Sequence, residues 1–512
     1  MRNPTITILK AIAIVLVVVA HSCPPMYLSR FSYMICVSLF FMASGYCFDT
    51  KYLNDEATFV KRRFRGLYVP FVKWSLFFLL LNAFWFWTGL LNEHYGNAAG
   101  GVTHPLNLHN WLQTLWSIVL NMSGYDQFLC GAYWFFRALL VSSILFLAYM
   151  KLLDSTERLN KRHAATAAIV AVGMVGLALW QTSDGLRWTG IAGGGYRELM
   201  GTFFLCAGFL YRRFEEWNAA PASTQPVISS AKAKSRNAQL LVKGANAAIR
   251  GCETIVRTIS SMPLVSMIIS ATVLALLVAF PHPTMAAKAR TLGEVLWLGL
   301  SGVVGFSFIY NLSRILHRIA ALRQPLTFIG DNTLYIFGWH MLAFKLASMI
   351  KVGVYGLPWA MVGSHPVVRI GNSDAFWILY TIVGITLPLG GISLLRYCRS
   401  HYNLDNYLQW ARTGLVYLWA AISYVAKWSW HGLRVGTMAL IHGIVWFVVK
   451  IWTHFYDFCI TFVDTVKAGA DVGQDKVEED DDEEDDDEYD DDEEEYDEDD
   501  GNEDDDRVKT DN

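Results

Sequence analysis

Acidic side chains are scarce in the first 474 residues of this 512-residue chain. Of the 46 Asp and Glu residues, 27 lie from Asp475 onward, which leaves 19 acidic residues beside 39 Lys and Arg in the body. The net charge of −4 therefore combines a body of +20 with a tail of −24. The basic residues lie between apolar runs and form no single patch, so they do not indicate a nucleic-acid-binding protein. This body composition excludes an ordinary soluble enzyme and indicates a polytopic membrane protein.

Sequence patterns that mark several kinds of site are missing too. The eight cysteines form no CxxC pair and mostly lie in or beside apolar runs, so we expect small buried side chains without a disulfide framework. The chain has no Walker loop and no dinucleotide fingerprint. His104 and His109 do not have a common helical ligand spacing, and no metal site is expected.

Apolar segments long enough to cross a membrane recur along the body. A span needs about 20 mostly apolar residues, and inside lipid it must be helical to satisfy its backbone hydrogen bonds. The first run, Ile6 to Ala20, has no clear cleavage site, so we predict a retained helix and not a signal peptide. The sequence predicts an all-α fold with about ten transmembrane helices, at residues 5–22, 32–49, 67–90, 131–150, 165–182, 195–211, 263–281, 292–312, 327–349 and 375–395.

The loop charges predict the orientation of these spans. With a cytoplasmic N-terminus, 24 Lys and Arg residues fall in inside segments and 6 in outside loops. The six outside residues are Arg30, Arg187, Lys288, Arg290, Lys351 and Arg369. This excess predicts that both termini lie in the cytoplasm, for a multi-pass protein of the cell (cytoplasmic or inner) membrane.

Three regions follow from the composition. Residues 1–400 form the predicted ten-helix domain, in which residues 212–262 are a long basic cytoplasmic loop. Residues 401–470 are aromatic and apolar, and form either amphipathic helices in the membrane interface or an additional transmembrane hairpin. Residues 471–512 cannot bury a core and are expected to be a disordered acidic tail, for which the basic cytoplasmic face is an electrostatic partner.

Lys10 and His21 are ionisable residues of the same predicted helix. Eleven residues separate them by about 16 Å and turn them only about 20° apart, so both point the same way. Charges inside a span are costly and ask for a reason. His21 suits proton abstraction from a hydroxyl, and Lys10 places a cation nearer the inner side. The alternatives are a snorkelling lysine and a packing histidine.

Polar residues follow at the inner ends of the next two spans. Ser44 and Gly45 permit close helix packing, and the Ser44 hydroxyl could instead bind a substrate. Arg62 and Arg65 lie three residues apart on one helical face at the start of the third span. Paired guanidinium groups suit bidentate phosphate binding, and an ordinary positive-inside cluster is the alternative.

The outer ends of other spans carry further candidates. Arg137 follows an aromatic run that includes Trp134, and Arg197 and Glu198 open the sixth span. These are either boundary charges or substrate-facing groups, and neighbours on a helix point about 100° apart, so Arg197 and Glu198 need not pair. His340 lies in an apolar stretch, where a packing role and a substrate-facing role are both open.

Taken in order, these motifs resemble the membrane-bound acyltransferase-3 family over about residues 5 to 395. Lys10 and His21 are similar to its Arg/Lys-x10-His pattern, Phe40 to Gly45 to its FFxxSG pattern, and Arg62 to Arg65 to its RxxR pattern. Tyr133-Trp134 and Gly330 to His340 resemble two later segments. The chain departs from the family where Lys10 replaces the commoner Arg, and where Arg137 follows Trp134 instead of an acidic residue.

The resemblance implies transfer of an acyl group, often acetyl, from cytoplasmic acyl-CoA to a hydroxyl of a glycan or other cell-envelope molecule. It implies that His21 is the general base or acyl relay and that Lys10 orients charge on the donor side. Arg62 and Arg65 would bind the CoA phosphates, and Ser44 would shape the site. Acetyl-CoA would be a co-substrate, with no permanently bound cofactor.

Two other functions are compatible with intramembrane charges. One is a transporter or flippase for a glycan or small polar solute, in which the charges line a path and no bond forms. Broken Gly/Pro helices repeated in both halves would favour transport, and no such repeat is seen. The other is a non-catalytic scaffold whose acidic tail recruits a partner.

Overall fold

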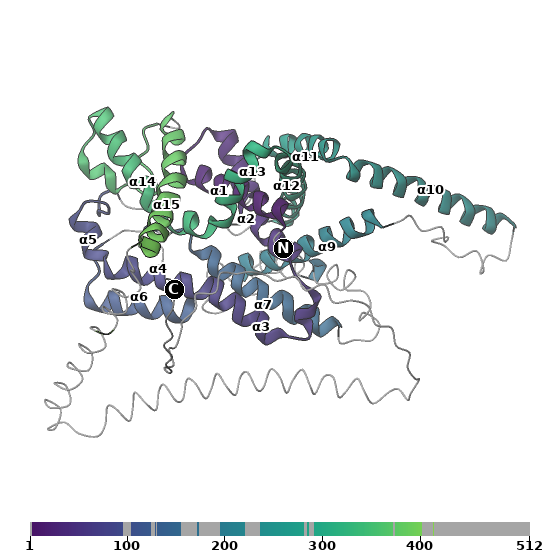
Figure 1. The fold of residues 1–512 in the computed structure, drawn as a ribbon, viewed down its shortest axis with the longest axis horizontal. Coiled ribbons are helices and arrows are strands. Elements are labelled where there is room, and N and C mark those ends of the chain that lie inside the picture. The colour runs from purple at the N-terminus through teal and green to yellow at the C-terminus, as the bar shows by residue number, and fades with distance from the viewer. Residues whose placement is uncertain are drawn as a thin grey trace, which may run out of the picture.

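A computed structural model of the chain describes residues 3–95, 104–123, 129, 131–154, 171–173, 195–220, 236–280, 284–285, 291–371, 374–401 and 413. Within these residues the regular structure is helical throughout and contains no strand, as predicted for an all-α fold (Figure 1). The predicted acidic tail, nearly all of 401–470 and most of the predicted span 165–182 lie outside the described residues.

Six helices in the described part of the chain are long and apolar enough to cross a membrane. A seventh candidate is a pair of helices, α10 (Arg236–Ser261) and α11 (Pro263–Val278), joined at a bend of 96°. These helices confirm a multi-pass membrane architecture. The six are α1 (Pro4–His21), α2 (Met26–Tyr46), α7 (Trp134–Asp154), α12 (Leu292–Arg318), α14 (Thr333–Tyr355) and α15 (Phe376–His401).

Three predicted spans differ from single apolar helices. The segment 327–349 is divided at Asn332, between α13 (Ala320–Asp331) and α14. The segment 67–90 is divided at Leu81 into α4 (Val69–Leu80) and α5 (Asn82–Trp87), because the backbone of Leu81 leaves the helical region at φ −94° and ψ 14°. The segment 195–211 belongs to α9 (Tyr196–Ala219), whose charged residues keep it out of the apolar set.

Short elements complete the described fold. The entry to α4 consists of η1 (Thr50–Leu53), α3 (Glu56–Arg63) and a π-helical turn, η2 (Phe64–Tyr68). Amphipathic α6 (Leu108–Asn121) packs on α4, while α13 (Ala320–Asp331) packs on α1. A 3-10 turn, η5 (Trp359–Gly363), follows α14.

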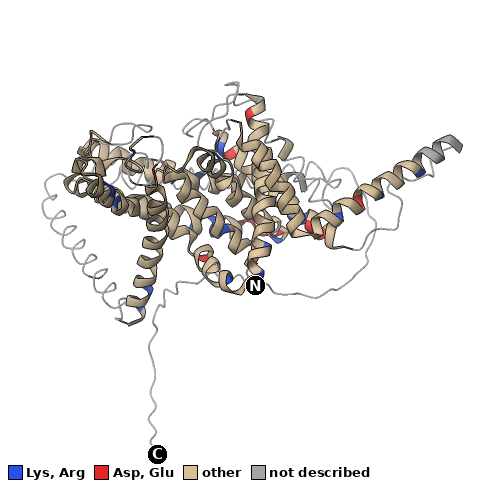
Figure 2. Ribbon diagram, turned by 90° about the horizontal axis from the view of Figure 1, so that it is seen from above, with Lys and Arg blue, Asp and Glu red and all other residues tan. Residues whose placement is uncertain are grey.

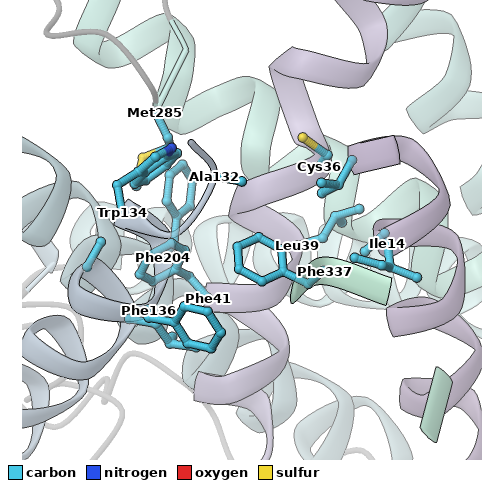
Figure 3. Packing of buried hydrophobic residues seen from close by; sticks show 14 of the residues in the cluster. Ile14, Cys36, Leu39, Phe41, Ala132, Trp134, Phe136, Phe204, Met285 and Phe337 are labelled. Atoms are coloured by element: carbon cyan, nitrogen blue, oxygen red, sulfur yellow. The ribbon is translucent and has the colours of Figure 1, made fainter. Parts of the chain in front are cut away.

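Helix α1 lies at the centre of the bundle, where it packs against α2, α12, α13, α14 and α15. Next to it, α2 and α9 approach closely because Gly45 and Gly208 have no side chain. A Cβ at Gly45 would collide with the carbonyl of Leu205, and one at Gly208 with the carbonyl of Met42. The packing role considered for Gly45 is therefore confirmed. The core is strongly aromatic, with Phe41, Phe136, Phe204 and Phe337 among its buried rings (Figure 3).

The bundle has two ends that differ in chemistry. The His21 end contains His21, Tyr33, Trp134 and Glu198, and the start of α15 meets it through a hydrogen bond from Thr381 to Ser22. The Tyr46 end contains Tyr46, Ser44, Arg63, Glu215 and Tyr310. Figure 2 shows the N-terminus and the basic end of α15 on the same side of the bundle. Helices α1, α2, α9 and α15 thus connect the two ends.

The cysteines only partly follow the expected burial. Cys36 and Cys206 are buried, whereas Cys47 and Cys252 are exposed. The exposed pair contradicts the expectation, because Cys47 lies at the C-terminal end of α2 and Cys252 lies within α10.

Candidate active site

Two histidines from distant parts of the chain meet at the His21 end. His21 is the last residue of α1, and His340 lies about two turns from the start of α14. The His340 Nε2 atom lies 3.3 Å from the His21 Nδ1 atom, and the two ring centroids are 5.2 Å apart. His340 is fully buried and His21 is half-buried. The inner imidazole is therefore fixed by the protein, while the outer one keeps an open side.

The contacts of His340 select a tautomer for both rings. Its Nδ1 atom lies 3.1 Å from the carbonyl oxygen of Ile336 and 2.9 Å from that of Phe337. Carbonyl oxygens only accept hydrogen bonds, so Nδ1 of neutral His340 carries the proton and Nε2 accepts. His21 Nδ1 must then donate to His340 Nε2. This leaves the Nε2 atom of His21 as an unprotonated base.

A cavity of about 50 Å³ opens beside His21 and has room for a group of a few heavy atoms. Val17 and His21 are one turn apart on α1 and both line it. Its other lining residues are Tyr33, Cys36, Val37 and Phe40 from α2, Ala132, Trp134 and Phe135 at the start of α7, and Thr284, Met285 and Phe337. Figure 3 shows two of these lining residues, Trp134 and Met285, next to each other. The base therefore faces a small, largely apolar chamber.

A loop fixed to α14 carries a third histidine to this end. Lys345 donates hydrogen bonds to the carbonyls of Val362, at 2.9 Å, and Ser364, at 2.7 Å. Lys351 binds the carbonyl of Val368, at 2.7 Å, and the carboxylate of Asp374. Both lysines are 2% exposed, so each ammonium group is satisfied by the loop and not by water.

The third histidine, His365, follows directly after the residue that Lys345 binds. Its Nε2 atom lies against Gly131, which adjoins the cavity residue Ala132. Burial, together with nearby Lys345 and His21, lowers the pKa of His365 to about 3, so it is neutral at physiological pH. The clamped loop therefore brings a neutral imidazole to the edge of the site.

Buried opposite charges also meet at the His21 end. The Arg137 Nε atom lies 3.3 Å from a carboxylate oxygen of Glu198, and both side chains are almost completely buried. The guanidinium of Arg197 stacks on the Trp134 ring at 4.4 Å. Arg197 and Glu198 thus contact different partners, because neighbouring residues of a helix point about 100° apart around its axis. In addition, Nη2 of Arg137 and Oε2 of Glu198 are buried with no protein hydrogen bond.

The remaining predicted residues lie away from His21. Ser44 accepts a 2.8 Å hydrogen bond from Nη2 of Arg63, a residue that the sequence patterns had not singled out. Arg62 binds the hydroxyl of Tyr52 at 3.2 Å, and Arg65 is exposed within the π-helical turn η2. Since the π turn is wider than an α turn, Arg62 and Arg65 do not share one regular helical face.

Lys10 is half-buried on α1, about 16 Å along the helix from His21. The structure therefore brings His21, His340 and Trp134 together, and it separates them from Lys10, Ser44, Arg62 and Arg65. No group of three His, Cys, Asp or Glu side chains in the described residues has the proximity of metal ligands.

The sequence profile of an acyltransferase domain matches residues 3–389, which include α1, α14 and about half of α15. The chain belongs to the acyltransferase-3 family of membrane O-acyltransferases. This membership makes it a membrane acyltransferase, and the matched residues contain both ends of the bundle. Neither a curated protein nor a solved structure matches the chain.

Sequence reasoning missed several residues of this acyltransferase's His21 end. Lys345 and Lys351 interrupt an apolar span, which was a usable signal, but Lys351 was assigned to an outside loop when it belongs to α14. His365, Tyr33 and Cys36 had no distinctive pattern, because only the fold brings them to the cavity or its edge.

Proposed function

We propose that this protein transfers an acyl group, most simply acetyl, from cytoplasmic acyl-CoA to a hydroxyl of a cell-envelope or extracellular glycan. The observation that carries this proposal is the His21–His340 pair, which leaves one imidazole nitrogen basic beside a small cavity. Geometry of this kind supports general-base catalysis, because a base must face the proton that it removes.

In the proposed reaction, His21 Nε2 takes the proton of the acceptor hydroxyl while the oxygen attacks the thioester carbonyl. The new C–O bond forms, the C–S bond breaks, and the proton passes from His21 to the departing CoA thiolate. His340 accepts from His21 Nδ1 throughout, so it orients the base and supports its charged form. The apolar cavity walls would hold the acyl group and exclude water.

The donor's charged end belongs at the Tyr46 end in this proposal. Arg62 and Arg65 are exposed there and would bind the CoA phosphates, with Lys10 providing positive charge on the path toward His21. Ser44 would act by holding Arg63. The pantetheine arm would then run along the bundle toward the cavity.

The acceptor would approach at the His21 end. Trp134 lines the cavity with Arg197 stacked on it, which suits contact with the apolar and polar faces of a sugar. Arg137 and Glu198 are buried, and their ion pair would fix the starts of α7 and α9, which carry Trp134 and Arg197.

The proposed topology has ten spans with both termini in the cytoplasm. The common side of the N-terminus and the α15 end supports it, because an even number of spans returns the chain to the side on which it began (Figure 2). The Tyr46 end is then cytoplasmic and the His21 end faces outward. Cysteine accessibility on each side of sealed vesicles tests this arrangement.

The proposed activity is tested with membranes that contain the full chain, acetyl-CoA labelled in its acetyl group, and an envelope glycan fraction. We expect covalent, base-labile label on the glycan, and loss of that label with His21→Ala. Label that enters vesicles without forming a bond would instead indicate a transporter or flippase. Unchanged transfer by His21→Ala would contradict the assigned base.

A further inference from the structure

Helix α10 lies at a right angle to the helix that follows it. The chain bends by 96° between α10 and α11, at Met262 and Pro263. Pro263 has no N–H to continue the preceding helix, and Met262 has the extended backbone expected before a proline. Helix α11 is apolar and exposes Leu264, Ile268 and Leu276, as expected of a helix that faces lipid. A helix at a right angle to a membrane-inserted helix lies along the membrane plane.

The basic and apolar residues of α10 lie on opposite faces. Lys243, Arg250 and Arg257 follow each other at intervals of seven residues, which is about 20° short of two full turns. They form a basic stripe along one side of the helix. Cys252, Val256 and Ile259 lie on the other side, between about 140° and 180° from Lys243. Strong segregation with a basic polar face is typical of helices that lie in a membrane interface.

One residue of the stripe fixes α10 to the bundle. Arg257 stacks on Trp217 at 4.1 Å and donates hydrogen bonds to the carbonyls of Asn218 and Ala220 at the end of α9. It also pairs with Glu253 on its own helix. The end of α9 belongs to the Tyr46 end of the bundle, because Glu215 binds Tyr46. Helix α10 therefore leaves from the same membrane side as Arg62 and Arg65.

The rest of α10 extends beyond the bundle. Figure 1 shows it projecting from α11, away from the other labelled helices. Its apolar side is uncovered by the described residues, with Ile255 60% and Val256 41% exposed. A helix of 26 residues is about 39 Å long, so this surface is extensive. In water it would be unstable, whereas the boundary between headgroups and acyl chains would cover it.

We propose that α10 is a membrane-surface arm that binds anionic phospholipid. Its apolar side lies in the acyl–headgroup boundary beside α11, and Lys243 and Arg250 bind the phosphate-bearing headgroups of the same leaflet. The charge of the stripe matches an anionic surface, and the right-angle bend sets the depth of the helix. Arg257 is a positioning residue that holds the arm to α9.

The test is amide hydrogen–deuterium exchange of residues 242–261 in the full-length protein. Lipid nanodiscs of phosphatidylcholine alone are compared with nanodiscs that also contain phosphatidylserine. We expect exchange to slow by roughly tenfold with the anionic lipid, since each basic residue near an anionic surface contributes a several-fold effect. Lys243→Glu with Arg250→Glu should remove this slowing. The control, Arg318→Glu with Arg323→Glu, reverses two exposed charges outside α10 and should retain it.

Several results would overturn the proposal. Exchange that is equal in neutral and anionic discs would exclude lipid-charge recognition. Protection that rises with protein concentration at fixed lipid would show that a second copy covers α10. Protection that disappears on truncation after residue 474 would show that the acidic tail covers it. None of these measurements depends on acyl transfer. The lipid-binding proposal for α10 can therefore be contradicted while the proposed acyltransferase function remains supported.

Discussion

The two ends of the bundle use charge in opposite ways. At the His21 end, Arg137, Glu198, Lys345 and Lys351 are buried, and each has a fixed partner within the protein. At the Tyr46 end, Arg62 and Arg65 are exposed. Buried, preorganised polar groups act strongly on a reacting centre, because water does not screen them. Exposed cations suit reversible binding of a soluble, charged molecule that must also leave.

This contrast gives each end a distinct dependence on mutation. A mutation at the His21 end leaves buried polar groups without a partner, and water cannot solvate them there. Its effects on stability or turnover should therefore be large. A change at the Tyr46 end leaves groups that remain hydrated, so its effects should be smaller and appear in donor affinity.

The buried Arg137–Glu198 pair should give the largest change in stability. Glu198→Leu leaves the Arg137 guanidinium buried without its counter-charge, which should lower the free energy of unfolding by about 3–5 kcal/mol. The double variant Arg137→Met with Glu198→Leu should recover most of that loss, because no isolated charge remains. Thermal unfolding in detergent micelles measures all three proteins. If Glu198→Leu alone were as stable as the parent, the pair would not be sealed from water as the structure shows.

Removing the partner of His21 should slow turnover without weakening substrate binding. His340→Leu deletes the acceptor for His21 Nδ1, and kcat should fall by about 10²-fold with both KM values little changed. His340→Gln retains an acceptor oxygen and should recover part of the rate. Steady-state kinetics with acetyl-CoA and a glycan acceptor separate these parameters. A leucine variant that equals the glutamine variant would show that His340 only fills space.

Release of the clamped loop should affect the acceptor more than the donor. Lys345→Met leaves the carbonyls of Val362 and Ser364 without their donor, which should cost about 1–3 kcal/mol and raise the acceptor KM several-fold. The donor KM should stay constant, since Arg62 and Arg65 are at the other end. Lys73→Met, at an exposed position of α4, is the matched control and should behave like the parent. An equal rise in both KM values would contradict a local role for the loop.

Contacts at the Tyr46 end should have modest effects on the donor. Ser44→Ala removes the hydrogen bond to Arg63, which is worth about 0.5–1.5 kcal/mol, and the KM for acetyl-CoA should rise a few-fold. Ser38→Ala is the control on the same helix, because the Ser38 hydroxyl binds only the carbonyl of Ile35 one turn away. A loss of kcat above about a hundredfold in Ser44→Ala would instead place Ser44 in the chemistry.

The long helices and several site residues could be predicted from the sequence, because each has a recognisable local pattern. Long apolar runs predicted α1, α2, α7, α12, α14 and α15, and the spacing of Lys10 and His21 correctly placed both on one helix. The break at Leu81 and the π turn at Phe64–Tyr68 have no comparable pattern, since tertiary packing decides them. The apolar pattern of a single sequence therefore predicted the long helices of the bundle but not the positions at which some of them break.

The histidine pair shows why the site itself was harder to predict. His21 and His340 were each recognised as unusual, but 319 positions separate them, and no spacing rule relates residues so far apart. The tautomer of His21 depends on the backbone carbonyls of Ile336 and Phe337. Every residue has such a carbonyl, so residue identities do not reveal this contact. Lys345 and Lys351 were visible as charges in a span, while their partners are backbone oxygens of a loop. Chemistry that depends on backbone groups leaves little trace in residue identities.

The acidic tail gives the smallest expected effect and tests the Tyr46 end alone. Its charge of −24 opposes the basic face that holds Arg62 and Arg65 in the proposed topology. Truncation after residue 474 should lower the KM for acetyl-CoA by about twofold at low salt, because a competing anion is removed. The difference should vanish as added salt screens the charges, and kcat should not change, since His21 lies at the opposite end of the bundle. A tail effect that persisted at high salt would require specific contacts, and a tail effect on kcat would mean that the two ends are coupled after all.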